Sequence, residues 1–132
     1  PKFYTLKFLS LFITLLLLVA CGSDYGNEVR GGNLTVFFVN ENDQEMAEDI
    51  ARFWKEHKLM TNEKQDLQLT KSGDWYSLNI IANETKSVKN MPFEERKVLL
   101  GVQRELREEL NESNFQLIIC NSSFEPIYNI NE

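Results

Sequence analysis

The 132-residue chain carries 20 acidic and 14 basic residues, which gives a formal net charge of −6. This acidic balance argues against nucleic acid as a partner and against unaided adhesion to an anionic lipid surface. The length fits one domain of ordinary size with a hydrophobic core of its own.

The N-terminal segment is apolar from residue 8 to residue 20 and follows two basic residues, Lys2 and Lys7. A helix of that length spans about 20 Å, which is shorter than the roughly 30 Å hydrocarbon core of a bilayer. The pattern therefore favours a cleavable signal peptide over residues 1–20 rather than a transmembrane helix. The segment ends in Leu18-Val19-Ala20-Cys21, in which a small residue precedes a cysteine.

These four residues resemble the lipobox of bacterial lipoprotein precursors. The resemblance implies cleavage between Ala20 and Cys21 and attachment of diacylglycerol to the Cys21 thiol through a thioether. Two or three acyl chains anchor a protein stably, whereas one anchors it only marginally. The alternative is an ordinary secretory signal with a chance cysteine.

Processing at this site removes two basic residues and no acidic ones, so the formal charge changes from −6 to −8. Lipidation of Cys21 leaves Cys120 as the one free thiol and permits no intrachain disulfide. We expect a flexible tether over residues 21–32, where small and polar residues dominate, and an α/β domain over residues 33–132. By analogy with enterobacterial sorting, Gly22 beside the lipid predicts the outer membrane, on its periplasmic side or at the surface.

The rest of the chain predicts four strands and two helices, followed by one more strand. Apolar spacing predicts strands at 34–39, 66–71, 75–81 and 115–120, helices at 42–58 and 90–110, and a last strand at 125–130. The order βαββαβ, with the added strand at an edge, predicts a ferredoxin-like α+β sandwich with both helices on one side of the sheet. In that sandwich the apolar strands 34–39 and 115–120 lie inside the sheet, and the polar strand 66–71 lies at an edge.

The order of elements over residues 33–130 is also similar to that of small uncharacterised domains of bacterial envelope proteins. This second resemblance is one of pattern, and it implies no activity and no site residue.

The second face of such a sheet has no helices behind it. Strand alternation places Phe37, Trp75 and Ile118 on this face, where they form a semi-apolar patch. Patches of this kind bind a partner protein or a second copy of the chain. The alternative is that the final strand and the tether fold over the patch. Trp75 is the best single candidate for a contact residue, and core packing is an alternative of at least equal weight.

Three groups of residues are candidates for chemistry, and each has a simpler structural interpretation. Cys120 lies in an apolar strand without a neighbouring His or Lys, which predicts an inert, buried thiol. His57 is the one histidine in the chain. We expect it to lie at a helix C-terminus with its ring nitrogens satisfied, because a zinc site needs further ligands. A solvated charged face is predicted for the glutamates of the second helix, Glu105, Glu108, Glu109 and Glu112. We therefore expect no catalytic residue, no metal site and no cofactor.

The sequence thus predicts a non-enzymatic, lipid-anchored lipoprotein of the bacterial envelope. Its partners are the membrane, through the lipid, and another protein or a second copy, through the second sheet face. The alternative function is that of a small-ligand carrier or sensor with a pocket between the sheet and the helices. An enzyme is the third and least favoured hypothesis.

Overall fold

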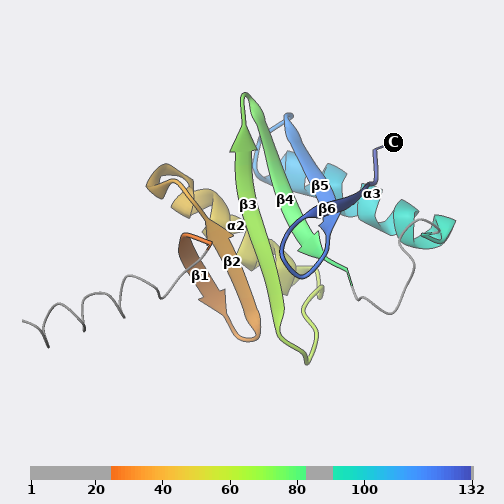
Figure 1. Ribbon diagram of the computed structural model, residues 1–132, viewed down its shortest axis with the longest axis horizontal. Helices are drawn as coiled ribbons and strands as arrows, with labels where there is room; N and C mark the ends of the chain where they lie inside the picture. Colours follow the sequence, from red (N-terminus) through yellow and green to blue (C-terminus); the bar gives the residue numbers. More distant parts are fainter. Residues whose placement is uncertain (1–24, 83–90, 132) are drawn as a thin grey trace, which may run out of the picture.

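The structure is a computed structural model that describes residues 25–82 and 91–131. The signal peptide predicted at 1–20 and the predicted lipidation site, Cys21, lie outside the described residues. Within the described part, a six-stranded mixed sheet packs against two α-helices (Figure 1). The α+β class predicted from the sequence is confirmed.

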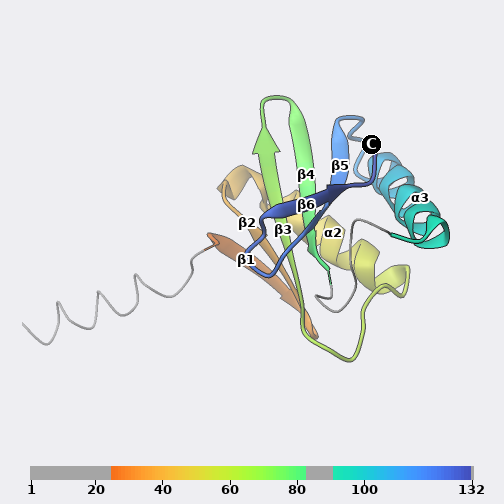
Figure 2. The same ribbon diagram turned by 45° about the vertical axis from the view of Figure 1, so that its right-hand side comes forward.

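The elements follow in chain order as β1 (Asn27–Gly31), β2 (Leu34–Phe38), the short 3-10 helix η1 (Glu41–Asp43), α2 (Gln44–Glu56), β3 (Gln65–Ser72), β4 (Trp75–Ile81), α3 (Phe93–Glu109), β5 (Phe115–Cys120) and β6 (Pro126–Asn129). The strands lie in the sheet in this same order, from β1 to β6. The β2–β3 and β4–β5 pairs are parallel, and the other three pairs are antiparallel. Helix α2 connects the first parallel pair and α3 the second, and both helices lie on one face of the sheet (Figure 2).

This strand order departs from the ferredoxin-like arrangement. The edge position predicted for strand 66–71 is wrong, because β3 pairs with β2 on one side and with β4 on the other. Two polar side chains of β3, Gln68 and Thr70, are hydrogen-bonded on the second sheet face, where Asn79 Nδ2 donates to Gln68 Oε1 at 2.9 Å and to Thr70 Oγ1 at 3.4 Å. A polar strand is stable inside a sheet when its neighbours satisfy its side chains. The extra C-terminal strand does lie at an edge, as predicted.

The tether predicted over residues 21–32 overlaps a strand, because residues 27–31 form β1. A two-residue turn, Gly32-Asn33, joins β1 to β2, and the φ of 61° at Gly32 suits the first position of such a turn. Gly26 has a φ of 90°, and a Cβ atom there would lie 2.7 Å from the carbonyl oxygen of Phe38. Glycine therefore permits the chain to enter the sheet at this point.

The core lies between the helices and the first face of the sheet. The side chains that alternation predicts to face the helices from the two apolar strands are buried there, namely Leu34, Val36, Phe38, Phe115, Leu117 and Ile119. Helix α2 contributes its predicted apolar side, including Ile50, Phe53 and Trp54, and α3 contributes Leu106. All of these residues belong to one continuous cluster.

Helix α3 also protects the outer edge of β5. Gln103 is 3% exposed, and its Oε1 accepts a hydrogen bond from the Leu117 amide at 3.0 Å. Its Nε2 donates to Asn131 Oδ1 at 2.8 Å, which ties the end of the chain to the helix. Arg107 Nε donates to the Phe115 carbonyl at 2.7 Å. Side chains of α3 thus satisfy strand backbone groups that would otherwise be orphaned.

Replacing Gln103 by leucine should therefore destabilise the domain. The Leu117 amide would lose its acceptor in a buried position, which lowers the free energy of unfolding by about 1–3 kcal/mol. Urea denaturation of the purified chain measures this change. Arg104→Ala, at an exposed position on the same helix, is the matched control and should change it by less than about 0.5 kcal/mol. Equal effects of the two substitutions would contradict the assigned role of Gln103.

Candidate binding surface

Three aromatic rings cover part of the second sheet face, and we call them the aromatic cap (Tyr25, Phe37 and Phe124). Phe37 projects from β2, Tyr25 precedes β1, and Phe124 lies in the loop between β5 and β6. The ring centroids lie 5.4 Å apart for Tyr25 and Phe37, 5.1 Å for Tyr25 and Phe124, and 6.3 Å for Phe37 and Phe124. The rings meet tilted or edge-on, which is a favourable geometry for aromatic pairs.

The loop between β5 and β6 is closed by Asn121. The Asn121 Oδ1 atom accepts hydrogen bonds from the amides of Ser123 and Glu125, both at 3.0 Å. The Asn121 amide donates to the Glu125 carbonyl at 3.0 Å. Within this loop Phe124 has a φ of 60°, a left-handed conformation that is unfavourable for a bulky residue. Burial of its ring against the rings of Tyr25 and Phe37 offsets that strain.

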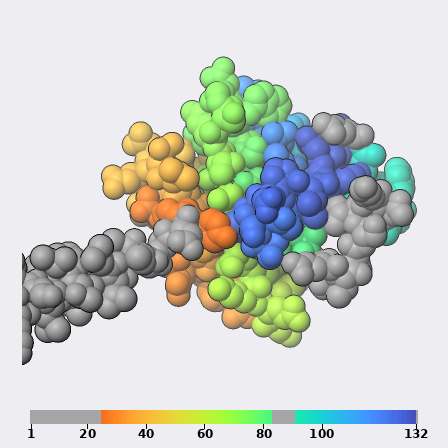
Figure 3. Space-filling model, viewed as in Figure 1, coloured from red at the N-terminus to blue at the C-terminus, as the bar shows by residue number. Residues whose placement is uncertain are grey.

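The aromatic cap favours the alternative in which the end of the chain and the tether fold over the second face. The loop before β6 and the residues before β1 fold over part of it, and the C-terminal residues, drawn in blue, lie over the middle of the sheet (Figure 3). Phe37 is half-buried in the cap instead of standing open. The predicted patch is therefore covered at this place.

The structure puts two of the three predicted contact residues into one row. The strand register places Phe37, Gln68, Asn79 and Ile118 opposite one another across four strands. The hydrogen-bonded pair of Gln68 and Asn79 separates the two apolar side chains. Phe37 and Ile118 consequently flank a polar floor and form no continuous apolar patch.

Two apolar side chains are exposed at the other end of the second face, above the buried Ser77, and we call this region the Trp75 end (Val39, Trp75, Ser77 and Gln116). Trp75 begins β4 beside the β3–β4 turn and is 43% exposed, and Val39, just after β2, is also exposed. Ser77 Oγ accepts a hydrogen bond from Gln116 Nε2 at 3.1 Å, so the floor beside the ring is satisfied. Of the three predicted contact residues, Trp75 is the one that stays accessible.

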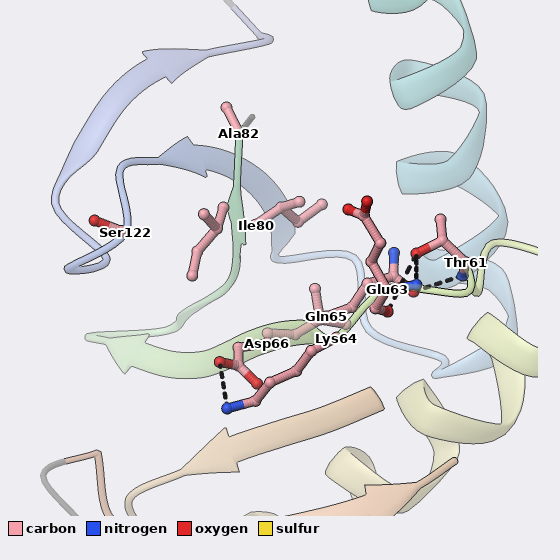
Figure 4. Close-up of a pocket in the computed structure, with 10 residues that line it drawn as sticks. Thr61, Glu63, Lys64, Gln65, Asp66, Ile80, Ala82 and Ser122 are labelled. Atoms are coloured by element: carbon pink, nitrogen blue, oxygen red, sulfur yellow. Dashed lines mark hydrogen bonds and ion pairs between the residues drawn. The ribbon is translucent and has the colours of Figure 1, made fainter. Parts of the chain in front are cut away.

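A pocket of about 620 Å³ lies where β3 begins and β4 ends, beside Ser122 of the β5–β6 loop (Figure 4). Ile80 and Ile81 form part of its wall, and Lys64 Nζ lies 3.7 Å from Asp66 Oδ2 at its rim. Its size is typical of small-ligand sites. Its position differs from the one predicted for a carrier, since core side chains occupy the space between the sheet and the helices.

His57 follows α2 and connects the two helices. Its ring stacks on Phe53 at 3.9 Å, its Nδ1 lies 3.3 Å from Glu105 Oε2, and its Nε2 lies 3.3 Å from Glu109 Oε1. The prediction of a satisfied histidine at a helix C-terminus is confirmed. Glu105 and Glu109, two of the four glutamates for which a solvated face is predicted, therefore contact His57 at the end of α2, and the prediction did not include this contact. Among the described residues, no three His, Cys, Asp or Glu side chains are grouped to hold a metal ion.

Cys120 ends β5 and is fully buried. Burial raises the pKa of its thiol from 9.0 to about 11. The thiol therefore stays protonated near neutral pH, and a protonated thiol is a poor nucleophile. The prediction of a buried cysteine is confirmed.

No protein-family model, no curated protein and no solved structure matches the chain. In the ranges 25–82 and 91–131, none of the helices has the length and apolar character needed to cross a bilayer.

Truncation of Phe124 tests the aromatic cap. Phe124→Ala removes the ring that Tyr25 and Phe37 contact, and the free energy of unfolding should fall by about 2–4 kcal/mol. Chemical denaturation measures it, with Trp75→Ala as the matched exposed aromatic, for which we expect a loss below about 1 kcal/mol. A larger loss for Trp75→Ala than for Phe124→Ala would show that the two rings have the opposite roles.

The raised pKa of the Cys120 thiol predicts its reactivity. The native processed chain should not react with a disulfide reagent at pH 8, because this thiol is buried and protonated there. After unfolding in guanidinium, one thiol per chain should react if Cys21 is acylated. Spectroscopic thiol titration measures both states, and rapid modification of Cys120 in the native state would contradict the structure.

Proposed function

We propose that the chain is a lipoprotein of the bacterial envelope whose folded domain binds another protein through the Trp75 end. The lipobox-like sequence that ends at Cys21 supports the lipid anchor. Gly22 after the lipidated cysteine favours the outer membrane, on its periplasmic side or at the surface, by analogy with enterobacterial sorting. The function involves no catalytic step, no cofactor and no nucleic acid.

The exposure of Trp75 is the observation that supports protein binding. Tryptophan is enriched among the residues that dominate binding energy at interfaces. The rings of Phe37 and Phe124 on the same face already pack within the aromatic cap. The hydrogen bond between Ser77 and Gln116 satisfies polar groups beside Trp75. A partner that covers the Trp75 end would bury an aromatic ring beside these satisfied groups.

The pocket at the start of β3 favours a second candidate function, that of a small-ligand carrier or sensor. Its volume of about 620 Å³ suits a small molecule, and it combines apolar wall residues with charged groups at the rim. A ligand bound there would raise the melting temperature progressively with its free concentration. A thermal-shift screen separates this function from protein binding. Ile81→Trp fills the pocket and should abolish the ligand-dependent rise in melting temperature, whereas Trp75→Ala should leave that rise unchanged.

The anchor is tested by mass spectrometry of the mature chain and by Cys21→Ser. We expect a mature N-terminus at residue 21 that carries two or three acyl chains. The Cys21→Ser chain should lose that lipid and leave the membrane fraction. A mature chain without fatty acid would contradict the proposed anchor.

The contact surface is tested by cross-linking in intact cells, followed by quantitative mass spectrometry of the captured proteins. Trp75→Ala should reduce capture of a specific partner by about tenfold or more, as expected for a central aromatic contact. Phe93→Ala on α3 is the matched control, because Phe93 is 74% exposed and lies on a different element. Retention of every partner by Trp75→Ala, or an equal loss with Phe93→Ala, would disprove the proposed surface.

A further inference from the structure

The two outer strands of the sheet differ in how their edges are protected. On the β6 side, Pro126 lacks a backbone donor, and Gln103 and Arg107 of α3 satisfy the Leu117 amide and the Phe115 carbonyl of β5. On the β1 side, the strand Asn27–Gly31 is the first in the sheet order and is exposed at every position except Val29, which is half-buried. Within the described residues, no strand pairs with the outer side of β1.

The turn that follows β1 determines which backbone groups point outward. In a hairpin closed by a two-residue turn, the flanking residues, here Gly31 and Leu34, form a hydrogen-bonded pair. Alternation then directs the amide and carbonyl groups of Val29 toward β2 as well. The amide and carbonyl groups of Glu28 and Arg30 point to the outer edge, where they are available to another strand.

The charges of β1 are self-complementary about its central residue. Glu28 and Arg30 stand on either side of Val29, and Val29 is the midpoint of the strand. Their side chains share one face of the sheet, since Arg30 Nε lies 3.0 Å from Glu28 Oε1. When two such strands run antiparallel with Val29 opposite Val29, each Glu28 lies opposite the Arg30 of the other chain.

We propose that β1 pairs with β1 of a second copy around a two-fold axis at Val29, which joins the two sheets into one. This register places the outward backbone groups of Glu28 opposite those of Arg30 in the second copy, which is the hydrogen-bonded arrangement of an antiparallel pair. It also brings two opposite-charge pairs together, and such cross-strand pairs are stabilising.

The other registers are less favourable. A shift by two residues places Glu28 opposite Glu28 or Arg30 opposite Arg30, and directly opposed like charges destabilise a strand pair. In the proposed register Asn27 lies opposite Gly31, which has no side chain to obstruct it. The ion pair within each chain is exposed, so exchanging it for a pair between chains changes the free energy little. Isologous contacts of this kind close into a dimer and do not propagate.

Disulfide trapping in membranes from cells that produce the full chain tests the register. Val29→Cys should yield a covalent dimer under a copper–phenanthroline oxidant, because opposed non-hydrogen-bonded residues are the closest across a strand pair. Glu28→Cys alone should cross-link at least about tenfold less, whereas Glu28→Cys and Arg30→Cys chains produced together should cross-link to each other. Mass spectrometry of the linked peptides separates these products from any that involve Cys21. Cross-linking of Glu28→Cys alone at the Val29→Cys yield would overturn the proposed register.

Charge exchange tests the pairing without a covalent bond. Glu28→Arg places four arginines at the axis and should weaken dimerisation of the detergent-solubilised chain by about tenfold or more, as measured by analytical ultracentrifugation. The double variant Glu28→Arg with Arg30→Glu restores opposite charges and should restore the dimer. Circular dichroism should show the same fold in every variant, because both positions are exposed. A chain that is monomeric at all concentrations, or a double variant as weak as the single one, would overturn the proposal.

Discussion

Each helix of this domain joins two neighbouring parallel strands, and both helices pack on one face of the sheet, where a single core cluster holds side chains from both. Among the described residues no helix lies on the second face, so its apolar side chains are covered by other parts of the chain where they are covered. The aromatic cap does this at one place, where Phe124 and Tyr25 meet Phe37. Hydrogen-bonded side chains form the floor beside it, and the Trp75 end is left open. The surface proposed for binding is thus what remains after the domain has covered its own second face.

The same constraint makes the two edges of the sheet unequal. The connection that contains α3 brings Gln103 and Arg107 against the edge of β5, and the end of the chain fastens there through Asn131. No equivalent helix side chain satisfies the outer edge of β1 within the described residues, where Glu28 and Arg30 supply its charge. Because the edge at β5 is satisfied and β1 carries self-complementary charges, association between two sheets is favoured at β1.

Sequence pattern predicted the elements between residues 34 and 130 and the side chains that face the helices, because alternation and helical spacing are local properties. It did not predict the strand order, since the polarity of β3 indicates an edge unless the side-chain pairing of Gln68 and Asn79 is known. Strand β1 was missed although Gly32-Asn33 is a hairpin signal, because the surrounding residues have the composition of a tether. The aromatic cap joins Tyr25 to Phe124 from opposite ends of the domain, and no local pattern records such a contact.

The most direct measurement of the central claim is a nuclear Overhauser spectrum of the aromatic ring protons in the full chain. If the aromatic cap covers its part of the second face, cross-peaks should connect the ring of Phe124 with the rings of Phe37 and Tyr25, because the centroids lie 5.1–6.3 Å apart. The ring of Trp75 should show no cross-peak to any of these three. Absence of the Phe124 cross-peaks, in a sample whose core ring Phe115 still shows contacts to Leu106 or Leu117, would mean that the second face is open and that this account of the surface is wrong.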